Sequence, residues 1–291
     1  MTYERSINRD LHFGALCWNQ YTDWPSLLDA GLRAERAGFY SLWTWDHLYP
    51  IVGSDKGPMF EGYLTLAAWA QATSRVRVGL MVGANPFRNP ALTAKMATTL
   101  DHISGGRAYL GIGGAWNEHE ARAFGIEFGE SPGERLRWLR EALPVMRGML
   151  HGEEASAAGP HYFVDGVRND PRPVQRHMPL LVGGGGEKVT LRLVARYGDA
   201  CNIGFAAGLD AFKRKEAALR RHCEELGRPY DEIEKTALLE LDLRPGRMSS
   251  RDAVTLLRSQ ADEGIEHAIV NMPNAHEMEP LRRIGREVIP A

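Results

Sequence analysis

An aspartate and a histidine stand side by side directly after an apolar run, in the stretch Phe39–His47 that ends with Trp45, Asp46 and His47. A histidine exchanges a proton near neutral pH, and a neighbouring carboxylate can orient its ring or hold a polar atom of a bound cofactor. The structural alternative is a capping aspartate beside a hydrogen-bonded histidine, and position alone does not separate the two. We take Asp46 and His47 as the candidate catalytic pair.

Four consecutive glycines follow the apolar run Pro179–Val182 and precede a predicted helix, Glu187–Tyr197. They are Gly183, Gly184, Gly185 and Gly186. A glycine turn that opens a helix exposes backbone N–H donors at the positive end of the helix dipole, which suits a phosphate. A flexible tight turn is the alternative, but four glycines in a row exceed what a turn requires. The segment therefore predicts an anion-binding turn.

Two other strand ends carry small residues. Gly79 lies inside the apolar run Val76–Val82, where a glycine marks a bulge, a close approach by a ligand or, as the favoured interpretation, packing against a bulky neighbour. Gly113 and Gly114 follow the run Arg107–Ile112 and leave backbone N–H groups accessible, although this pattern is a weak signal by itself. Both stretches are secondary candidates for ligand contact.

The charged stretch from Asn117 to Glu120 holds a histidine between two glutamates. Its spacing matches no zinc motif and no cysteine lies close in the sequence, so a solvated helix start is the preferred interpretation. Arg88 in NPFRNP either meets an anion or is a solvated loop cation, and Trp116 either packs in the interior or offers a stacking surface. We predict no metal site, and a metal-dependent amidohydrolase is a weak alternative because the strand ends lack clustered histidines.

The elements that must position these residues alternate along the chain. The predicted strands are Leu11–Cys17, Phe39–Trp45, Val76–Val82, Arg107–Ile112, Pro179–Val182, Asp199–Ile203, Thr236–Leu243 and His267–Asn271. The predicted helices are Trp24–Gly38, Tyr63–Thr73, Pro90–Ile103, Pro132–Leu150, Glu187–Tyr197, Asp210–Leu226, Ser250–Gly264 and Glu279–Val288. About eight β/α units predict an α/β fold of the (β/α)8 TIM-barrel type, in which active sites lie where strands end.

The length of 291 residues suits one barrel, which needs roughly 250 residues, so we expect residues 1–291 to form a single domain. An open doubly wound sheet is the rival fold, but its glycine fingerprint belongs in the first β/α turn, which has no glycine here. The segment His151–Met178 is rich in Gly, Pro and Ala, and we interpret it as a surface insertion between helix four and strand five.

Composition excludes several classes of partner. Charged residues make up 25% of the chain and the formal net charge is -2, so nothing indicates nucleic acid or a membrane surface. The unpaired spacing of Cys17, Cys201 and Cys223 suits a reducing compartment, where they would be buried apolar residues. The polar start MTYERSINRD is no signal peptide, and no apolar run is long enough to span a membrane. We expect a soluble, cytoplasmic protein with a small-molecule substrate.

Four long stretches resemble the luciferase-like monooxygenase family, in its branch that depends on the deazaflavin coenzyme F420. They are ERAGFYSLWTWDH, PMFEGYLTLAAWAQATSRVRVG, RNPALTAKMATTLDHISGGRAYLGIGGAWNEHEARAFGI and PLLVGGGGEKVTLRLVARYGDACN. The resemblance covers nearly the whole chain and implies a luciferase-like (β/α)8 barrel, often dimeric, with the cofactor ring at its mouth.

The resemblance also implies roles for individual residues. Asp46 and His47 would lie beside the ring, with His47 as proton donor or acceptor. The ring would rest on a bulge, often with a non-proline cis peptide, formed by Gly79, Leu80, Met81 and Val82. The phosphate tail would contact Gly113, Gly114, Gly183, Gly184, Gly185 and Gly186.

Departures from the family bear on the substrate. Sugar-phosphate dehydrogenases of this branch carry a glutamate where this chain has Gly114, and a tryptophan where it has Leu48–Ile51. Many relatives carry a threonine at the position of Leu80. We therefore expect hydride transfer between F420 and another small organic substrate. The expected pocket walls are Trp18, Trp43, Tyr49, Met59, Phe60 and the insertion 151–178.

Two other functions remain open on the sequence. The first is an FMN-dependent monooxygenase that uses O2 and takes reduced flavin from a separate reductase, since both types share the same barrel. The second is a non-catalytic protein that binds a flavin or deazaflavin, which the missing loop glutamate at Gly114 makes conceivable.

Overall fold

The strands of the chain form one parallel sheet that curves into a barrel. The computed structural model describes residues 11–204, 208–244, 246–272 and 278–291. The strands of this sheet are β1 (His12–Cys17), β2 (Ser41–Thr44), β3 (Arg77–Leu80), β4 (Gly83–Ala84), β5 (Leu110–Gly113), β8 (Leu180–Val182), β9 (Ala200–Asn202), β10 (Glu234–Glu240) and β11 (His267–Met272). Their order is β3-β2-β1-β11-β10-β9-β8-β5-β4.

The two ends of this order belong to one interrupted strand, which closes the barrel. β3 pairs with β2 and β4 pairs with β5, both in parallel. The cis peptide bond Met81-Val82 separates β3 from β4, and Val78 forms a further parallel bridge to Ala108, two residues before β5. Counting β3 and β4 as one, the nine strands occupy eight positions. The (β/α)8 prediction is confirmed, and the open doubly wound alternative is wrong.

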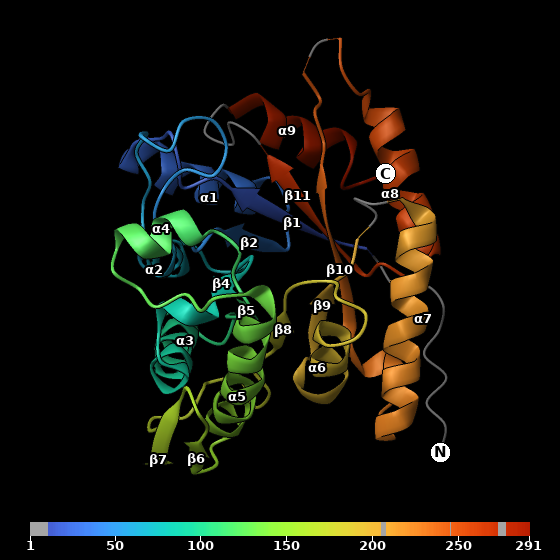
Figure 1. Cartoon of the computed structure of the whole chain (residues 1–291). Helices are drawn as coiled ribbons and strands as arrows, with labels where there is room; N and C mark the ends of the chain where they lie inside the picture. Colours follow the sequence, from blue (N-terminus) through green and yellow to red (C-terminus); the bar gives the residue numbers. More distant parts are fainter. Residues whose placement is uncertain (1–10, 205–207, 245, 273–277) are drawn as a thin grey trace.

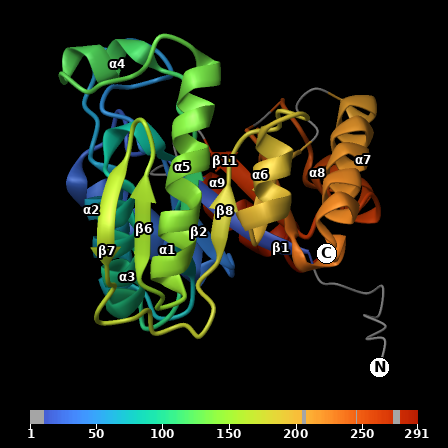
Figure 2. The same cartoon turned by 60° about the horizontal axis from the view of Figure 1, so that its bottom comes forward.

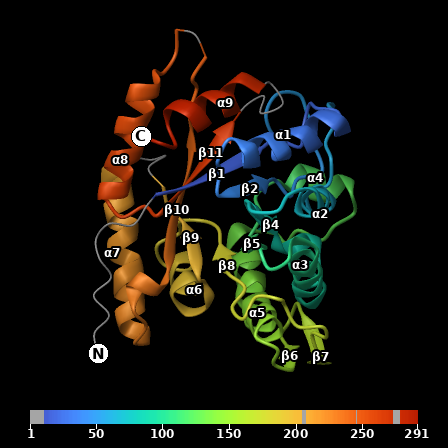
Figure 3. The same ribbon diagram turned by 180° about the vertical axis from the view of Figure 1, so that it is seen from behind.

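Helices follow the strands and surround the barrel (Figure 1). They are α1 (Trp24–Arg36), α2 (Gly62–Ala72), α3 (Pro90–Ser104), α4 (Glu118–Ala123), α5 (Pro132–Leu150), α6 (Thr190–Tyr197), α7 (Leu209–Leu226), α8 (Ser250–Asp262) and α9 (Met278–Glu287). In Figure 3, α7 and α8 stand on one flank, and α2 and α3 stand on the other.

The sequence marks several of these helix ends. The Asp23 side chain accepts a hydrogen bond from Ser26 N–H at the start of α1, and the Ser131 side chain does the same for Glu134 N–H at the start of α5. α3 ends at Gly105, whose φ of 66° is left-handed and therefore suits glycine. One prediction fails: α6 begins at Thr190 rather than Glu187, because a turn separates it from the glycines.

The predicted insertion between the fourth barrel helix and the fifth barrel strand is an antiparallel hairpin of β6 (Ala155–Ala158) and β7 (Phe163–Val167). Figure 2 shows it lying along α5. The Asn169 side chain donates hydrogen bonds to Thr98 of α3 and to the Met149 carbonyl of α5. The insertion thus covers the outside of the barrel, as predicted.

The amino end of the barrel interior holds a closed polar network. His267 Nε2 lies 2.7 Å from the Ser41 hydroxyl, and His267 Nδ1 lies 3.1 Å from Glu234 Oε1. Trp43 Nε1 donates to Ser41 Oγ at 2.7 Å, and the Tyr109 hydroxyl donates to Glu234 Oε2 at 2.9 Å. Burial is the largest single influence on Glu234 and penalises its charge, but the hydrogen bonds from His267 and Tyr109 and the charge attraction to His267 together outweigh it, and the pKa of Glu234 falls below its usual value.

The three cysteines are buried and free, as predicted. Burial raises the pKa of Cys17 and of Cys201 to about 12, so both remain thiols. In the described part of the chain, every helix is too short or too polar to cross a membrane. The polar stretch MTYERSINRD, from which the absence of a signal peptide was inferred, lies outside the described residues.

Candidate functional site

A cavity of about 610 Å³ opens at the carboxyl ends of the barrel strands. Its wall takes residues from the loops after β2, β3, β5 and β8 and from β10 and β11. Eight predicted site residues form part of this wall: Asp46, His47, Met81, Val82, Gly113, Gly114, Gly183 and Gly184. The histidine and the glycine turn therefore share one cavity, although they are more than a hundred residues apart in sequence.

His47 is held by a glutamate that the sequence did not single out. Its Nδ1 lies 2.5 Å from Oε1 of Glu120, which belongs to α4 and whose side chain is 1% exposed. Oε2 of the same carboxylate accepts hydrogen bonds from the backbone N–H groups of Leu48 and Tyr49, at 2.7 and 3.3 Å. His47 Nε2 makes no hydrogen bond within the described part of the chain, so it is the ring nitrogen available to the cavity.

Asp46 forms a different arrangement. Its two oxygens accept hydrogen bonds from both terminal nitrogens of Arg88, at 2.7 and 2.9 Å, and Oδ2 also accepts from Ala84 N–H at 2.8 Å. Burial alone would lower the pKa of Arg88, but Asp46 raises it above its usual value. Arg88 also contacts Glu61 at 2.9 Å. Arg88 therefore meets an anion inside the protein, and Asp46 joins the end of β2 to the strand that follows the cis peptide.

The floor of the cavity beside β3 and β4 is formed by Met81 and Val82, at the cis peptide bond expected from the resemblance. Two glycines leave room for the Val82 side chain. A β-carbon on Gly113 would lie 2.9 Å from Val82 Cγ2, and one on Gly183 would lie 2.5 Å from the same atom. The glycines therefore let the strand ends approach Val82 closely.

Two of the residues predicted to bind the cofactor face elsewhere. A β-carbon on Gly79 would meet the Trp43 ring at 2.6 Å, so this glycine accommodates core packing inside the barrel. Leu80 is 1% exposed, and its Cδ2 lies 2.7 Å from the position of a β-carbon on Gly62 of α2. Its side chain packs against the helix layer. Neither residue lines the cavity, and the packing interpretation of Gly79 agrees with the structure.

The glycine turn divides into two halves. Gly183 and Gly184 line the cavity, and Gly184 has a φ of 104° that only glycine adopts easily. Gly185 and Gly186 do not line it. A β-carbon on Gly185 would lie 2.9 Å from Lys215 Nζ, and one on Gly186 would lie 3.0 Å from the hydroxyl of Thr190. The second half of the turn thus makes room for neighbouring side chains.

Aromatic residues surround the cavity mouth. The Trp116 ring lies 5.3 Å from the His47 ring, and Trp116 is 64% exposed, so it lines the cavity rather than packing in the barrel. Ala115 before it has a left-handed φ of 62°, which costs energy in a residue with a β-carbon. On the other side, Trp18 Nε1 donates to Oδ1 of Asn271 at 2.5 Å, and this amide is part of the wall.

All of the predicted wall residues lie outside the cavity lining. They are Trp18, Trp43, Tyr49, Met59, Phe60 and the insertion 151–178. Trp43 is fully buried, and the insertion packs on the outer faces of α3 and α5. The apolar wall comes instead from Trp45, Ile51, Trp116, Leu136 and Leu238. The sequence offered Trp116 as a possible stacking surface but did not single out the other four as wall residues, because loop packing decides which side chains turn inward.

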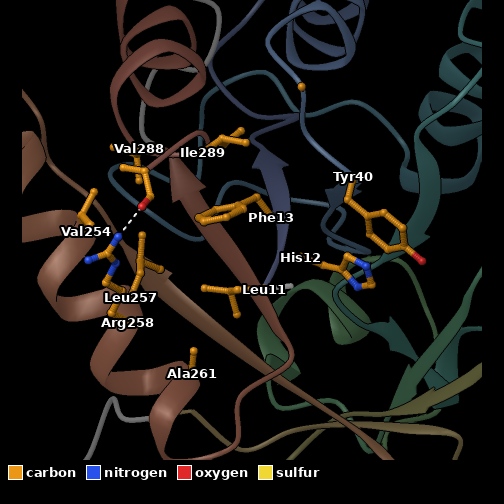
Figure 4. Close-up of a pocket in the computed structure, with 12 residues that line it drawn as sticks. Leu11, His12, Phe13, Tyr40, Val254, Leu257, Arg258, Ala261, Val288 and Ile289 are labelled. Carbon is orange, nitrogen blue, oxygen red and sulfur yellow. Dashed lines mark hydrogen bonds between the residues drawn. The ribbon is translucent and has the colours of Figure 1, made fainter. Parts of the chain in front are cut away.

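A second hollow, of about 570 Å³, lies near the amino end of β1 (Figure 4). Apolar side chains dominate it, with Phe13 from β1 and Leu257 from α8, and the Tyr40 and His12 rings stack at one side with centroids 3.9 Å apart. None of the predicted site residues lines it. Among the described residues no group of three or more His, Cys, Asp or Glu side chains is arranged to hold a metal ion.

Comparison with known proteins gives a family match over almost the whole chain. A family model described as luciferase-like monooxygenase matches residues 12–287. An uncharacterised protein of Mycobacterium tuberculosis is 32% identical over 185 residues, which cover 58% of this chain and 64% of that protein. The F420-dependent glucose-6-phosphate dehydrogenase of Kineococcus radiotolerans is 33% identical over 217 residues, which cover 74% of this chain and 63% of the relative. The chain thus spans less than two thirds of the length of these relatives.

Solved structures share the fold at low identity. An F420-dependent secondary alcohol dehydrogenase, solved in complex with an F420-acetone adduct, matches with a TM-score of 0.82 at 19% identity, covering 97% of this chain and 98% of that one. The oxygenating constituent of 3,6-diketocamphane monooxygenase from Pseudomonas putida, solved with FMN, matches with a TM-score of 0.72 at 17% identity, covering 97% and 98%. At these low identities, the similarity shows that the chain shares the barrel fold of these proteins and nothing about their function.

Proposed function

Since the chain belongs to the luciferase-like monooxygenase family, we propose that it is an oxidoreductase that transfers a hydride between coenzyme F420 and a small organic substrate. The observation that carries this proposal is the shared cavity, whose wall contains His47, the Met81–Val82 floor and the first half of the glycine turn. The family and the F420-dependent relative supply the class of reaction.

The residues present fit a tricyclic cofactor with an anionic tail. The cavity volume lies within the range of cofactor sites, roughly 300–1,000 Å³. Gly113 and Gly183 lack the β-carbons that would displace Val82 from the cavity floor, and Gly184 leaves its backbone open at the wall. When bound, F420 supplies a carbon centre that accepts or donates a hydride. Gly114 and Gly184 would hold the tail with backbone N–H groups, whereas the Gly183 N–H already donates to the Ile112 carbonyl at 2.8 Å.

The protein's own contribution is a proton and a rigid site. His47 Nε2 takes the hydroxyl proton of an alcohol during oxidation, or returns a proton to the oxygen during reduction. The Asp46 carboxylate accepts hydrogen bonds from Arg88 and from Ala84 N–H, and these contacts hold this part of the cavity wall in place. The proposed role of Asp46 is therefore structural support of the cavity, and proton transfer belongs to His47.

The wall favours a substrate other than a sugar phosphate. Gly114 and Ile51 line the cavity at or near the positions where sugar-phosphate dehydrogenases of the family carry a glutamate and a tryptophan. Apolar side chains from Trp45, Leu136 and Leu238 surround the remaining space. We propose a small, largely apolar alcohol or carbonyl compound, since only its oxygen needs a polar partner.

An FMN-dependent monooxygenase is the second candidate, and the similarity to an FMN-bound oxygenase of the same fold favours it. That enzyme type would need reduced flavin from a separate reductase. Titration of the purified protein with F420 and with FMN separates the two: we expect micromolar binding of F420 and none of FMN. Binding of FMN alone would reject the F420 proposal. Tight cofactor binding without turnover of any alcohol or carbonyl in a broad panel would favour a non-catalytic carrier.

A further inference from the structure

Glu120 is a buried carboxylate, and within the described residues its side-chain hydrogen bonds all go to residues 47–49, here called the histidine loop. Its side chain is 1% exposed, and its partners are His47 Nδ1, Leu48 N–H and Tyr49 N–H. The ion pair on the exposed face of α4 is formed by Glu118 and Arg122, so Glu120 takes no part in it. A buried charge without partners is costly, so this carboxylate is stable only in contact with the loop.

The chemistry of these partners determines which way the hydrogen bonds run. A backbone N–H only donates, so Oε2 accepts from Leu48 and Tyr49. An ionised carboxylate is an acceptor at both oxygens, and Oε1 therefore accepts a hydrogen bond from His47 Nδ1–H. With the proton held at Nδ1, the neutral ring has its lone pair on Nε2, the nitrogen available to the cavity.

We propose that Glu120 is a positioning residue that fixes the tautomer of His47, so that Nε2 alone exchanges the proton with a bound substrate. The use of this proton in catalysis rests on the proposed function, whereas the tautomer itself depends on the apoprotein alone. The arrangement also fixes the ring direction, because the same carboxylate holds the ring and the two following backbone amides.

Nitrogen-15 NMR of the cofactor-free protein tests the tautomer directly. The ten histidines are labelled in the ring, and the His47 signals are assigned by their loss in His47→Gln. We expect a protonated Nδ1 and an unprotonated Nε2 at a pH where the ring is neutral. The reverse pattern, or an equal mixture of the two tautomers, would overturn the proposal whatever the cofactor proves to be.

The Glu120→Gln variant sharpens the test, because an amide cannot accept hydrogen bonds at both ends. Its oxygen turns to Leu48 and Tyr49 N–H, and its NH2 group then faces His47 Nδ1. We expect the His47 proton to move to Nε2. Glu118→Gln is the matched control on the same helix, where the side chain is 58% exposed and contacts Arg122 instead. An unchanged tautomer in folded Glu120→Gln would show that Glu120 does not fix it.

A second variant covers the case in which Glu120→Gln does not fold. Glu120→Asp retains the charge but withdraws the oxygens by one methylene, so it cannot reach all three donors, and we expect a mixture of tautomers. A single Nδ1–H tautomer in Glu120→Asp would contradict the proposal. With an F420-coupled substrate in hand, Glu120→Gln should lose about 10²-fold in turnover while retaining F420 affinity. Absence of F420 binding in the unaltered protein rejects the proposed function and leaves the NMR result standing.

Discussion

Among the described residues, a histidine–glutamate pair lies near each end of the barrel strands, apart from the pair His222–Glu225 on the outer helix α7. At the carboxyl end, His47 Nδ1 lies 2.5 Å from Glu120, and its Nε2 has no partner in the described part of the chain. At the amino end, His267 Nδ1 lies 3.1 Å from Glu234, and its Nε2 lies 2.7 Å from the Ser41 hydroxyl. The two pairs have similar chemistry and differ in whether the second nitrogen is occupied.

This difference separates a structural histidine from a candidate catalytic one. His267 is fully buried and both its nitrogens are paired, so its polar groups are satisfied and no substrate reaches it. His47 has one nitrogen fixed by Glu120 and the other available at a cavity wall. A serine, a histidine and a glutamate that are hydrogen-bonded in a row therefore do not make a catalytic site unless a substrate can reach the histidine.

Replacement of the two histidines should separate activity from stability. His47→Ala should reduce turnover of F420-coupled substrate by about 10²–10⁴-fold, because the proton-transfer group is lost, while F420 binding is mostly retained. Steady-state kinetics with F420 titration measures both. Full activity of folded His47→Ala would reject the acid/base assignment.

His267→Ala should have the opposite profile. Removal of this ring leaves Trp43 Nε1 as the remaining partner of Ser41 Oγ and the Tyr109 hydroxyl as the remaining partner of the Glu234 carboxylate. Glu234 Oε1 becomes a poorly compensated, largely buried charge, so the free energy of unfolding should fall by about 3 kcal/mol. Urea denaturation followed by circular dichroism gives the value. Turnover per folded molecule should stay within about threefold of the unaltered protein, and a much larger loss would mean that the network at the amino end also shapes the site.

Two glycines, one at each end of the barrel strands, allow the same substitution to be compared at both ends. A β-carbon on Gly14 would lie 2.6 Å from Ser41 Oγ and 3.0 Å from His267 Nε2, whereas one on Gly183 would lie 2.5 Å from Val82 Cγ2. Gly14→Ala should lower the free energy of unfolding by about 1–3 kcal/mol, because the added carbon overpacks a closed network. Gly183→Ala should weaken F420 binding about tenfold or more through displacement of Val82. Equal effects of both variants on affinity would contradict the separation of the two regions.

The smallest expected effect is the pH dependence of the amino-terminal pair. The pKa of Glu234 is lower in the folded state, because burial, the largest single influence, is outweighed by the His267 and Tyr109 interactions together. A lowered pKa stabilises the fold above the usual glutamate range, and this contribution disappears as the pH falls through the folded value. Glu234→Gln should therefore cost about 1–2 kcal/mol at pH 7 and progressively less in acid. Urea denaturation at pH 7, 5 and 4 checks this, and a difference that does not shrink would contradict it.

The sequence predicted the barrel well because its period is local. Each β/α unit is recognisable in the sequence as an apolar run, a turn and an amphipathic helix. The predicted helix Pro132–Leu150, for example, has the same bounds in the structure. The start of α6 was missed by three residues, since nothing local distinguishes a glycine turn from the first turn of a helix. The resemblance gave a bulge over residues 79–82, often with a cis peptide. The structure places the cis bond at Met81-Val82, and strand pairing shows that the barrel closes there.

Only those site residues that lie at strand ends or in glycine-rich turns could be predicted from the sequence. His47, Gly183 and Gly184 were identified because barrel topology gathers strand ends at one face. Glu120 was assigned to solvent, since its helix is short and charged and its burial depends on contact with a loop seventy residues earlier. Arg88 had two open interpretations, and only the position of Asp46 decided between them.

The carboxylate on α4 also has a consequence for engineering. The histidine loop and the short helix after β5 are joined by three hydrogen bonds to one side chain, so they behave as a single transferable module. A chimera that moves residues 45–49 of this chain into a scaffold without the carboxylate of residues 114–123 would lose the partner that, in our proposal, holds the proton at Nδ1. Directed evolution of new specificities should therefore recombine these two loops together and vary the remaining strand ends independently.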